Sequence, residues 1–183
     1  MSQLNKDTLL DSALGLASNK GWEAFTMSQL AERLDVSLTE IYQLVKQKDD
    51  LAEALFDRAD LNMLATSHQD DFQQASPQQK LQQLMSSWLN TLTPYRPMVR
   101  QMFGYKLEPG HLHLQALGLL RISRTVQWML HASDTTLTGL HRIKEEIILT
   151  QLYLAAVTYW IVRGPNEQAL QKFLNRLLAR YIT

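Results

Sequence analysis

Hydroxyl, amide and ammonium groups between Thr26 and Leu51 have the types and spacing needed for contacts with DNA. Leu38, Thr39 and Gln43 fall on the outward face of one short predicted helix. A glutamine amide can pair with adenine through two hydrogen bonds, and a leucine or threonine methyl group can contact the methyl group of thymine. These residues therefore predict readout of base edges in the major groove.

Two capping boxes position this helix and the helix before it. Thr26 with Gln29, and Ser37 with Glu40, each combine a hydroxyl with an amide or carboxyl group three residues later, a pattern that begins a helix. Asp35 lies between the two predicted helices, and aspartate tolerates the left-handed backbone of a sharp turn better than most residues. Glu40 could cap the helix or read cytosine, and the capping box favours the first role.

Apolar residues at helical spacing complete the arrangement. The small Ala31, the turn at Asp35 and the aliphatic Ile41 have the spacing of a helix-turn-helix, whose second helix lies in the DNA major groove. The residues expected to face inward are Leu30, Ala31, Leu34, Ile41, Leu44 and Val45, with Val36 filling the turn.

The segment from Leu9 to Leu55 resembles the N-terminal domain of the TetR family of transcriptional regulators. In that family a glycine and an aromatic residue end the first helix, a threonine begins the second, a Val-Ser pair precedes a recognition helix that contains a tyrosine, and a lysine followed by a leucine opens the fourth. The matching residues are Gly21-Trp22, Thr26, Val36-Ser37, Tyr42, Lys48 and Leu51.

The resemblance implies that the protein binds DNA. Thr26 and Tyr42 would contact phosphates through a hydroxyl group or a backbone amide, and Lys48 would contact them by charge. The full set of expected DNA-binding residues is Thr26, Ser37, Leu38, Thr39, Tyr42, Gln43, Lys46 and Lys48.

The charge of the chain is unevenly distributed. Residues 1–60 contain six Lys or Arg and eleven Asp or Glu, a formal charge of −5, and the remaining residues carry +5. Because phosphate neutralisation supplies much of the affinity for DNA, the DNA-binding face needs a locally basic character. Carboxylates such as Asp7, Asp11, Glu53 and Asp57 are therefore expected to point away from DNA.

Composition favours a cytoplasmic protein without a catalytic centre. The 183 residues are 45% hydrophobic and include no cysteine, which suits a reducing compartment. The first residues lack the basic start and apolar run of a signal peptide. No nucleophile elbow, phosphate-binding loop, dinucleotide-binding or zinc-protease motif occurs. His111 and His113 lie two residues apart without a nearby carboxylate cluster, so we expect no metal site and no cofactor.

The periodicity of apolar residues predicts an all-α protein of about nine helices. Residues 1–48 would form a three-helix DNA-binding domain with the helix-turn-helix, and residues 49–183 a helical effector-binding and dimerisation domain. A polar segment at residues 66–79 is the best candidate for a boundary between folding units, and Ser76, Pro77 and Gln79 mark the start of the helix that follows it.

Aromatic and methionine side chains in the second domain could surround a small apolar or lipid-like effector. Plain core packing explains the same spacing. Arg121 could meet an acidic group of such a ligand, and a solvated helix face explains it equally well. The candidate pocket residues are Met85, Trp88, Met98, Met102, Phe103, Tyr105, Leu117, Arg121, Trp128, Tyr153 and Trp160.

The segment from Ile147 to Val162 is apolar on nearly all sides, yet at 16 residues it is too short to span a membrane, which takes about 20. Such a helix needs cover on two sides, and a second copy of the last two helices could supply one of them. We therefore expect a homodimer through residues 139–162 and 166–181. The candidate interface residues are Ile148, Leu152, Ala155, Tyr159, Leu170, Phe173, Leu174 and Leu177.

A second resemblance leaves an alternative open. The carboxyl-terminal half, from Ala132 through Gly164, is loosely similar to accessory proteins of ubiquinone biosynthesis. Those proteins have a TetR-like fold, bind isoprenoid lipids and do not regulate transcription. The sequence therefore favours a regulator, with a lipid-binding module as the alternative.

Overall fold

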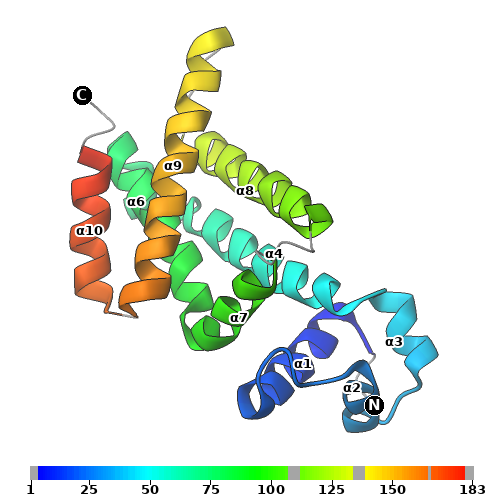
Figure 1. Cartoon of the computed structure of the whole chain (residues 1–183). Coiled ribbons are helices and arrows are strands. Elements are labelled where there is room, and N and C mark those ends of the chain that lie inside the picture. The colour runs from blue at the N-terminus through cyan, green and yellow to red at the C-terminus, as the bar shows by residue number, and fades with distance from the viewer. Residues whose placement is uncertain (1–3, 107–111, 134–138, 165, 180–183) are drawn as a thin grey trace.

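Helices α1, α2 and α3 form a small unit at one end of the molecule, and the long helix α4 leads from this unit into the body (Figure 1). The computed structural model describes residues 4–106, 112–133, 139–164 and 166–179, and contains no β-strand in these ranges. The helices are α1 (Lys6–Lys20), α2 (Met27–Leu34), α3 (Leu38–Leu44), α4 (Lys48–Thr66), α5 (Asp70–Gln73), α6 (Pro77–Leu92), the 3₁₀ helix η1 (Thr93–Tyr95), α7 (Arg96–Lys106), α8 (Leu112–Ala132), α9 (Gly139–Arg163) and α10 (Glu167–Ala179).

Helix α1 packs its apolar face against the rest of the small unit. The Asn5 side chain accepts a hydrogen bond from the Thr8 amide at 2.8 Å, which caps the start of the helix. Gly21 ends the helix with a positive φ of 90°, a conformation that favours glycine. Its apolar face is buried through Leu9, Leu10, Ala13, Leu14 and Ala17.

Helix α4 connects the small unit to the body. The Asp50 carboxylate accepts hydrogen bonds from the amides of Lys46 (2.7 Å) and Gln47 (3.2 Å), so it stabilises the chain at the start of the helix. Arg58, further along α4, forms an ion pair with Asp11 of α1 at 2.6 Å. Leu51, Leu55, Ala59 and Met63 of α4 are buried and fix the helix in the core.

The polar segment between α4 and α6 contains a feature that the sequence did not predict. Residues 70–73 form the short helix α5, because Phe72 is fully buried and holds this turn against α6. Helices α4 and α6, on either side of the segment, pack extensively against each other. The segment therefore lies within the body and does not separate two folding units.

Helix α9 is the longest helix, and its first turns extend beyond the ends of α8 and α10 (Figure 1). One face is buried through Leu149, Tyr153, Ala156 and Trp160. The opposite face is uncovered, with Leu140 82% exposed. Among the described residues, no helix combines the length and apolar character that a membrane-crossing segment requires.

Candidate nucleic-acid interface

The outward face of α3 displays the residues predicted to contact bases. Leu38 and Tyr42 are 52% and 59% exposed, and Thr39 and Gln43 are exposed beside them. Ile41, on the opposite face, is 1% exposed and packs into the core. The amphipathic pattern thus presents a short helix whose surface carries one amide, two hydroxyl groups and an aliphatic side chain.

The turn between α2 and α3 has the conformation predicted for Asp35. Its φ of 54° and ψ of 47° are left-handed, and no other non-glycine residue in the described ranges has a positive φ. The Val36 amide donates to the carbonyl of Ala31 at 3.1 Å, which closes the turn. This sharp reversal fixes the angle between α2 and α3.

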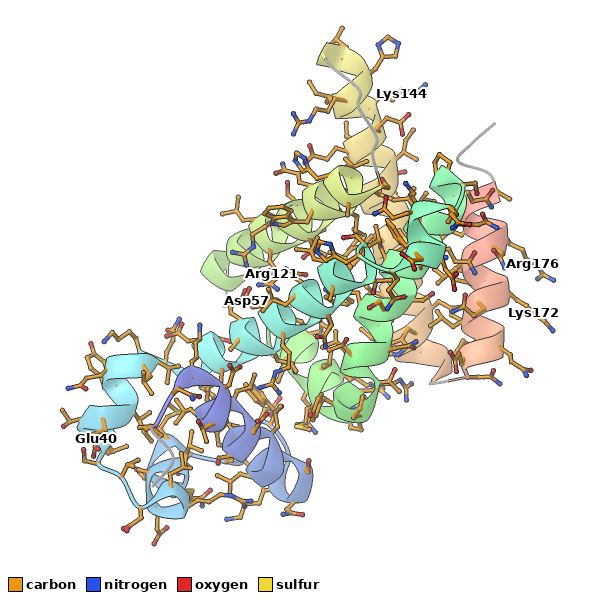
Figure 2. The ribbon with its side chains drawn as sticks, turned by 180° about the vertical axis from the view of Figure 1, so that it is seen from behind. Glu40, Asp57, Arg121, Lys144, Lys172 and Arg176 are labelled. Atoms are coloured by element: carbon orange, nitrogen blue, oxygen red, sulfur yellow. The ribbon has the colours of Figure 1, made fainter. Side chains whose placement is uncertain are left out.

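Both predicted capping boxes are formed. The Ser37 hydroxyl accepts from the Glu40 amide at 3.2 Å, while the Glu40 carboxylate accepts from the Ser37 amide at 2.9 Å and from its hydroxyl at 2.8 Å. Hydrogen bonds from the Ser37 backbone and side chain lower the pKa of Glu40. Glu40 lies on α3, at the end of the molecule far from α10 (Figure 2). The Oε2 atom of Glu40 accepts both hydrogen bonds from Ser37, which favours the capping role over cytosine readout.

Thr26 and Lys48 are engaged within the chain. The Thr26 hydroxyl accepts from the Gln29 amide at 3.2 Å. The Lys48 ammonium group donates to the carbonyls of Glu23 (3.1 Å) and Phe25 (2.8 Å), and burial lowers its pKa. The half-buried ammonium group of Lys48 thus holds the turn between α1 and α2, and its phosphate contact stays a prediction.

Lys46 carries an exposed ammonium group beside α3. Its Nζ donates to the carbonyl of Tyr42 at 2.6 Å and lies 4.1 Å from the centre of the Tyr42 ring. A cation above an aromatic face is attracted to the ring electrons. Tyr42 and Lys46 therefore form one surface pair, which places a hydroxyl group and a positive charge next to the base-reading residues.

A buried polar cluster joins α4, α6 and α8 in the body. Arg121 is 8% exposed and pairs with Asp60 at 2.9 Å, with Glu53 at 3.4 Å and with Asp57. Figure 2 shows Arg121 and Asp57 side by side between α8 and α4. Asp60 also accepts from Trp88 Nε1 at 2.8 Å and from the Thr125 hydroxyl at 3.0 Å. Burial raises the pKa of Asp60, and the charge of Arg121 opposes this shift.

This cluster changes the expected role of Arg121. The sequence left open an acidic ligand for its guanidinium group, and carboxylates of α4 occupy that place. Its Nε is buried and has no hydrogen-bond partner among the described residues. The Arg121 side chain is thus a connection between α8 and α4 and is already neutralised.

The predicted pocket residues fall into three groups. Most are buried in the body, and the rings of Phe56 and Trp88 stack there with their centres 6.1 Å apart. Trp128 is 48% exposed on the outer face of α8, which separates it from the others. Phe103 is half-buried, and the side chains of Tyr105 and Leu117 lie outside the described residues. The buried members are Met85, Trp88, Met98, Met102, Arg121, Tyr153 and Trp160.

Comparison with known proteins identifies the family. Residues 9–55 match the model of the bacterial regulatory proteins of the tetR family. The crystal structure of the TetR transcriptional regulator from Nitrosomonas europaea is 36% identical, with a TM-score of 0.84 over 96% of each chain. The chain belongs to the TetR family. No curated protein matches it.

Two more distant TetR-family structures share the fold. The regulator PfmR from Thermus thermophilus is 19% identical, with a TM-score of 0.52 over 93% of this chain and 97% of that chain. A TetR/AcrR regulator from Thermobifida fusca is 17% identical, with a TM-score of 0.57 over 97% and 98% of the two chains. A helix-turn-helix unit on a helical body is therefore the architecture of this TetR-family protein.

The predicted interface residues of this TetR-family chain do not share one surface. Leu170 and Leu174 are 3% and 0% exposed, so they pack within their own chain. Tyr159 and Phe173 stack with ring centres 4.1 Å apart and are half-buried between α9 and α10. The remaining candidates, Ile148, Leu152, Ala155 and Leu177, are also half-buried.

Four exposed apolar side chains in the amino-terminal part of α9 lie on a face other than the predicted interface. Leu140, Ile143, Ile147 and Leu154 are 82%, 55%, 53% and 40% exposed. Their spacing of three, four and seven residues places them in one stripe along the helix. The outward side of α10 is charged and not apolar, since Lys172 and Arg176 point away from the body there (Figure 2). Sequence periodicity identified α9 as apolar but could not show which side its own chain covers.

The sequence did not predict a role for Asp60, which is buried in the cluster with Arg121. It occurs among apolar residues of α4, one turn after Phe56 and close to Ala59 and Met63. A carboxylate on the buried face of a helix requires a partner, because an unpaired buried charge is costly. The position of Asp60 among apolar residues therefore could have predicted a buried ion pair, although not its partner Arg121.

Proposed function

We propose that this protein is a ligand-responsive transcriptional repressor that binds a palindromic operator as a homodimer in the cytoplasm. The observation that carries the proposal is the exposed face of α3. It presents Leu38, Thr39, Tyr42 and Gln43 on a helix-turn-helix whose turn and both caps are formed. The 36% identity to a TetR transcriptional regulator over nearly the whole chain supports the same function.

The proposed DNA contacts divide by chemistry. Leu38, Thr39 and Gln43 read base edges, whereas Tyr42 and Lys46 contact the phosphate backbone with a hydroxyl and an ammonium group. Thr26 and Ser37 begin α2 and α3, and their amide and hydroxyl groups are engaged in the capping boxes, so they contribute to the interface by holding the first turns of these helices in place. Lys46 provides an exposed positive charge beside α3.

The proposed dimer uses the exposed stripe of α9. Four large aliphatic side chains in one row are unfavourable in water, and a second copy of the same stripe would bury them. A two-fold dimer presents two α3 helices to half-sites about one DNA turn, roughly 34 Å, apart.

The proposed effector is a small, largely apolar molecule bound in the body. The stacked rings of Phe56 and Trp88, with Phe103 5.8 Å from Phe56, provide aromatic walls near the half-buried Phe103 side chain. The carboxylates of Glu53, Asp57 and Asp60 already pair with Arg121, so they disfavour a further anion there. An effector without an acid group fits this environment best.

Selection from a library of random duplexes tests the proposed function. The purified full-length chain should enrich a palindromic sequence, and a gel shift with that duplex should show one complex. A promoter overlapping the site should be repressed in a reporter strain. If no duplex is retained at low salt and lipid co-purifies with the protein, the lipid-binding alternative replaces the regulator.

A further inference from the structure

The helix-turn-helix unit contacts the body at a second place besides α4. This contact lies between the turn that joins α1 to α2 and helix α7. Gly21 has a φ of 90°, and a Cβ atom at this position would lie 3.3 Å from the Oε1 atom of Gln101. Both the backbone conformation and the close approach therefore favour glycine. The glycine lets a side chain of α7 reach the main chain of the turn.

Gln101 makes a hydrogen bond to this turn. Its Oε1 accepts from the Trp22 amide at 2.7 Å, between residues that are 79 positions apart in the chain. Trp22 and Phe25 are 4% and 1% exposed, and their rings meet edge to face at 5.2 Å. Lys48 donates to the next carbonyls of the same turn. The turn is thus fixed from two sides, by α4 and by α7.

The amino-terminal end of α7 is attached to a different part of the body. Arg96 donates from Nε to the carbonyl of Trp160 at 3.0 Å and from Nη2 to the carbonyl of Ile161 at 2.5 Å. These carbonyls belong to the last turn of α9, and the Trp160 carbonyl also accepts from the Gly164 amide at 3.2 Å. Arg96 and Gln101 are five residues apart on one helix, about 7.5 Å along its axis. Helix α7 therefore joins the end of α9 to the helix-turn-helix unit.

We propose that Gln101 is a positioning residue for operator binding, which sets the placement of the helix-turn-helix unit relative to α9 through the Trp22 amide. This role rests on the proposed function, because only a dimer on two half-sites requires a fixed separation of its α3 helices. Gln101 touches no DNA in this role. Its loss leaves the α3 surface intact and allows the unit to shift about α4.

Three variants test the role. Gln101→Leu removes the acceptor, and the adjoining pocket of about 470 Å³, lined by Arg96, Pro97, Arg100 and Gln101, gives the leucine room. Gln101→Glu keeps an acceptor oxygen for the Trp22 amide and should restore wild-type behaviour. Gln82→Leu is the matched control, because Gln82 donates to Gln171 at 2.6 Å within the body.

The measurement compares the selected operator with duplexes in which one base pair is inserted or removed between the half-sites. One base pair moves a half-site by about 3.4 Å and turns it by about 35°. Wild type, Gln101→Glu and Gln82→Leu should all prefer the selected spacing strongly. Gln101→Leu should bind the selected operator about three- to tenfold more weakly and lose most of the spacing preference. Its affinity for a duplex with a single half-site should remain within about twofold of wild type.

Hydrogen exchange of the Trp22 amide reports the contact independently of DNA. We expect exchange about three- to tenfold faster in Gln101→Leu, and unchanged in Gln101→Glu and Gln82→Leu. Unchanged exchange, an unchanged spacing preference, or an equal loss on the single half-site would each overturn the positioning role. If wild type retains no duplex at all, the proposed function fails and this role fails with it, while Trp22 exchange still shows whether the contact exists.

Discussion

Internal hydrogen bonds decide which polar side chains of the helix-turn-helix remain for DNA. Ser37, Thr26 and Glu40 are occupied by caps, and Lys48 by two carbonyls of the α1–α2 turn. Gln43, by contrast, is exposed, and no hydrogen bond of its side chain is present within the described part of the chain. The side chain with the greatest freedom to read a base is therefore an amide on α3.

Gln43→Ala should relax sequence preference at one base pair of the operator. A bidentate amide contact contributes about 1–3 kcal/mol of discrimination against the wrong base, so the variant should bind matched and substituted operators more equally. Competition gel shifts with single-base substitutions measure this. Gln168→Ala, an exposed amide on α10, is the control, and it should leave the base preference unchanged.

Arg121→Met should destabilise the fold by about 3–5 kcal/mol near pH 7, because Asp60 is left as a buried charge without its main partner. Denaturant unfolding measures this free energy. The double variant Arg121→Met/Asp60→Asn should recover part of the loss, since a neutral amide needs no counter-charge. If the double variant is no more stable than Arg121→Met, lost packing and not the unpaired charge causes the loss of stability.

The free energy of unfolding of Arg121→Met should also depend on pH differently from that of wild type. Arg121 lowers the pKa of Asp60, and burial raises it. Without Arg121 the pKa of folded Asp60 lies further above its unfolded value, so the folded state binds more protons and gains stability as the pH falls. The deficit relative to wild type should therefore shrink between about pH 7 and pH 5. A deficit that grows over this interval would contradict the assignment.

At the scale of elements, short-range capping and one left-handed residue build the helix-turn-helix. The helices α2 and α3 contain eight and seven residues, too few to be stable alone in water. Their ends are defined by capping boxes, and their apolar faces by Leu30, Ala31 and Ile41. The angle between the two helices depends on Asp35.

Substitution of Asp35 should change stability according to backbone preference. Asp35→Gly should stabilise the protein by up to about 1 kcal/mol, because glycine adopts the left-handed conformation at low cost. Asp35→Val should destabilise it by about 1–2 kcal/mol. Thermal and urea unfolding measure both, with the exposed Glu32→Val on α2 as a control within about 0.5 kcal/mol of wild type.

For the whole molecule, two features of the body concern the proposed function. The exposed stripe of α9 is the proposed dimer surface, and α7 joins the far end of α9 to the turn between α1 and α2. Helix α4 provides the second connection, through Arg58 to α1 and through its carboxylates to Arg121. The helix-turn-helix unit is thus attached to the body at two places, through α7 and through α4.

Ile147→Glu should weaken the dimer by at least about tenfold, because it places a charge within the apolar stripe. Sedimentation equilibrium measures the association, and operator affinity should fall with it. Leu61→Glu is the matched control, since Leu61 is 68% exposed on α4 away from the stripe. A monomeric wild type, or equal association of the two variants, would count against the α9 interface.

The sequence by itself determined the all-helical class, the positions of the two short helices and the outward face of α3. These features depend on interactions over three to eight residues, such as the capping boxes and the left-handed Asp35, which the local pattern contains. The match to the TetR pattern at residues 9–55 followed from the same local order.

The tertiary structure alone decided the partners of Lys48, Arg121 and Gln101, and it showed which side of α9 is uncovered. These contacts join residues between 23 and 79 positions apart, so they exist only once the helices have packed. Residue type shows that a charge or an amide needs a partner. Which group becomes that partner depends on helix packing, because many chain groups could satisfy the same hydrogen bond.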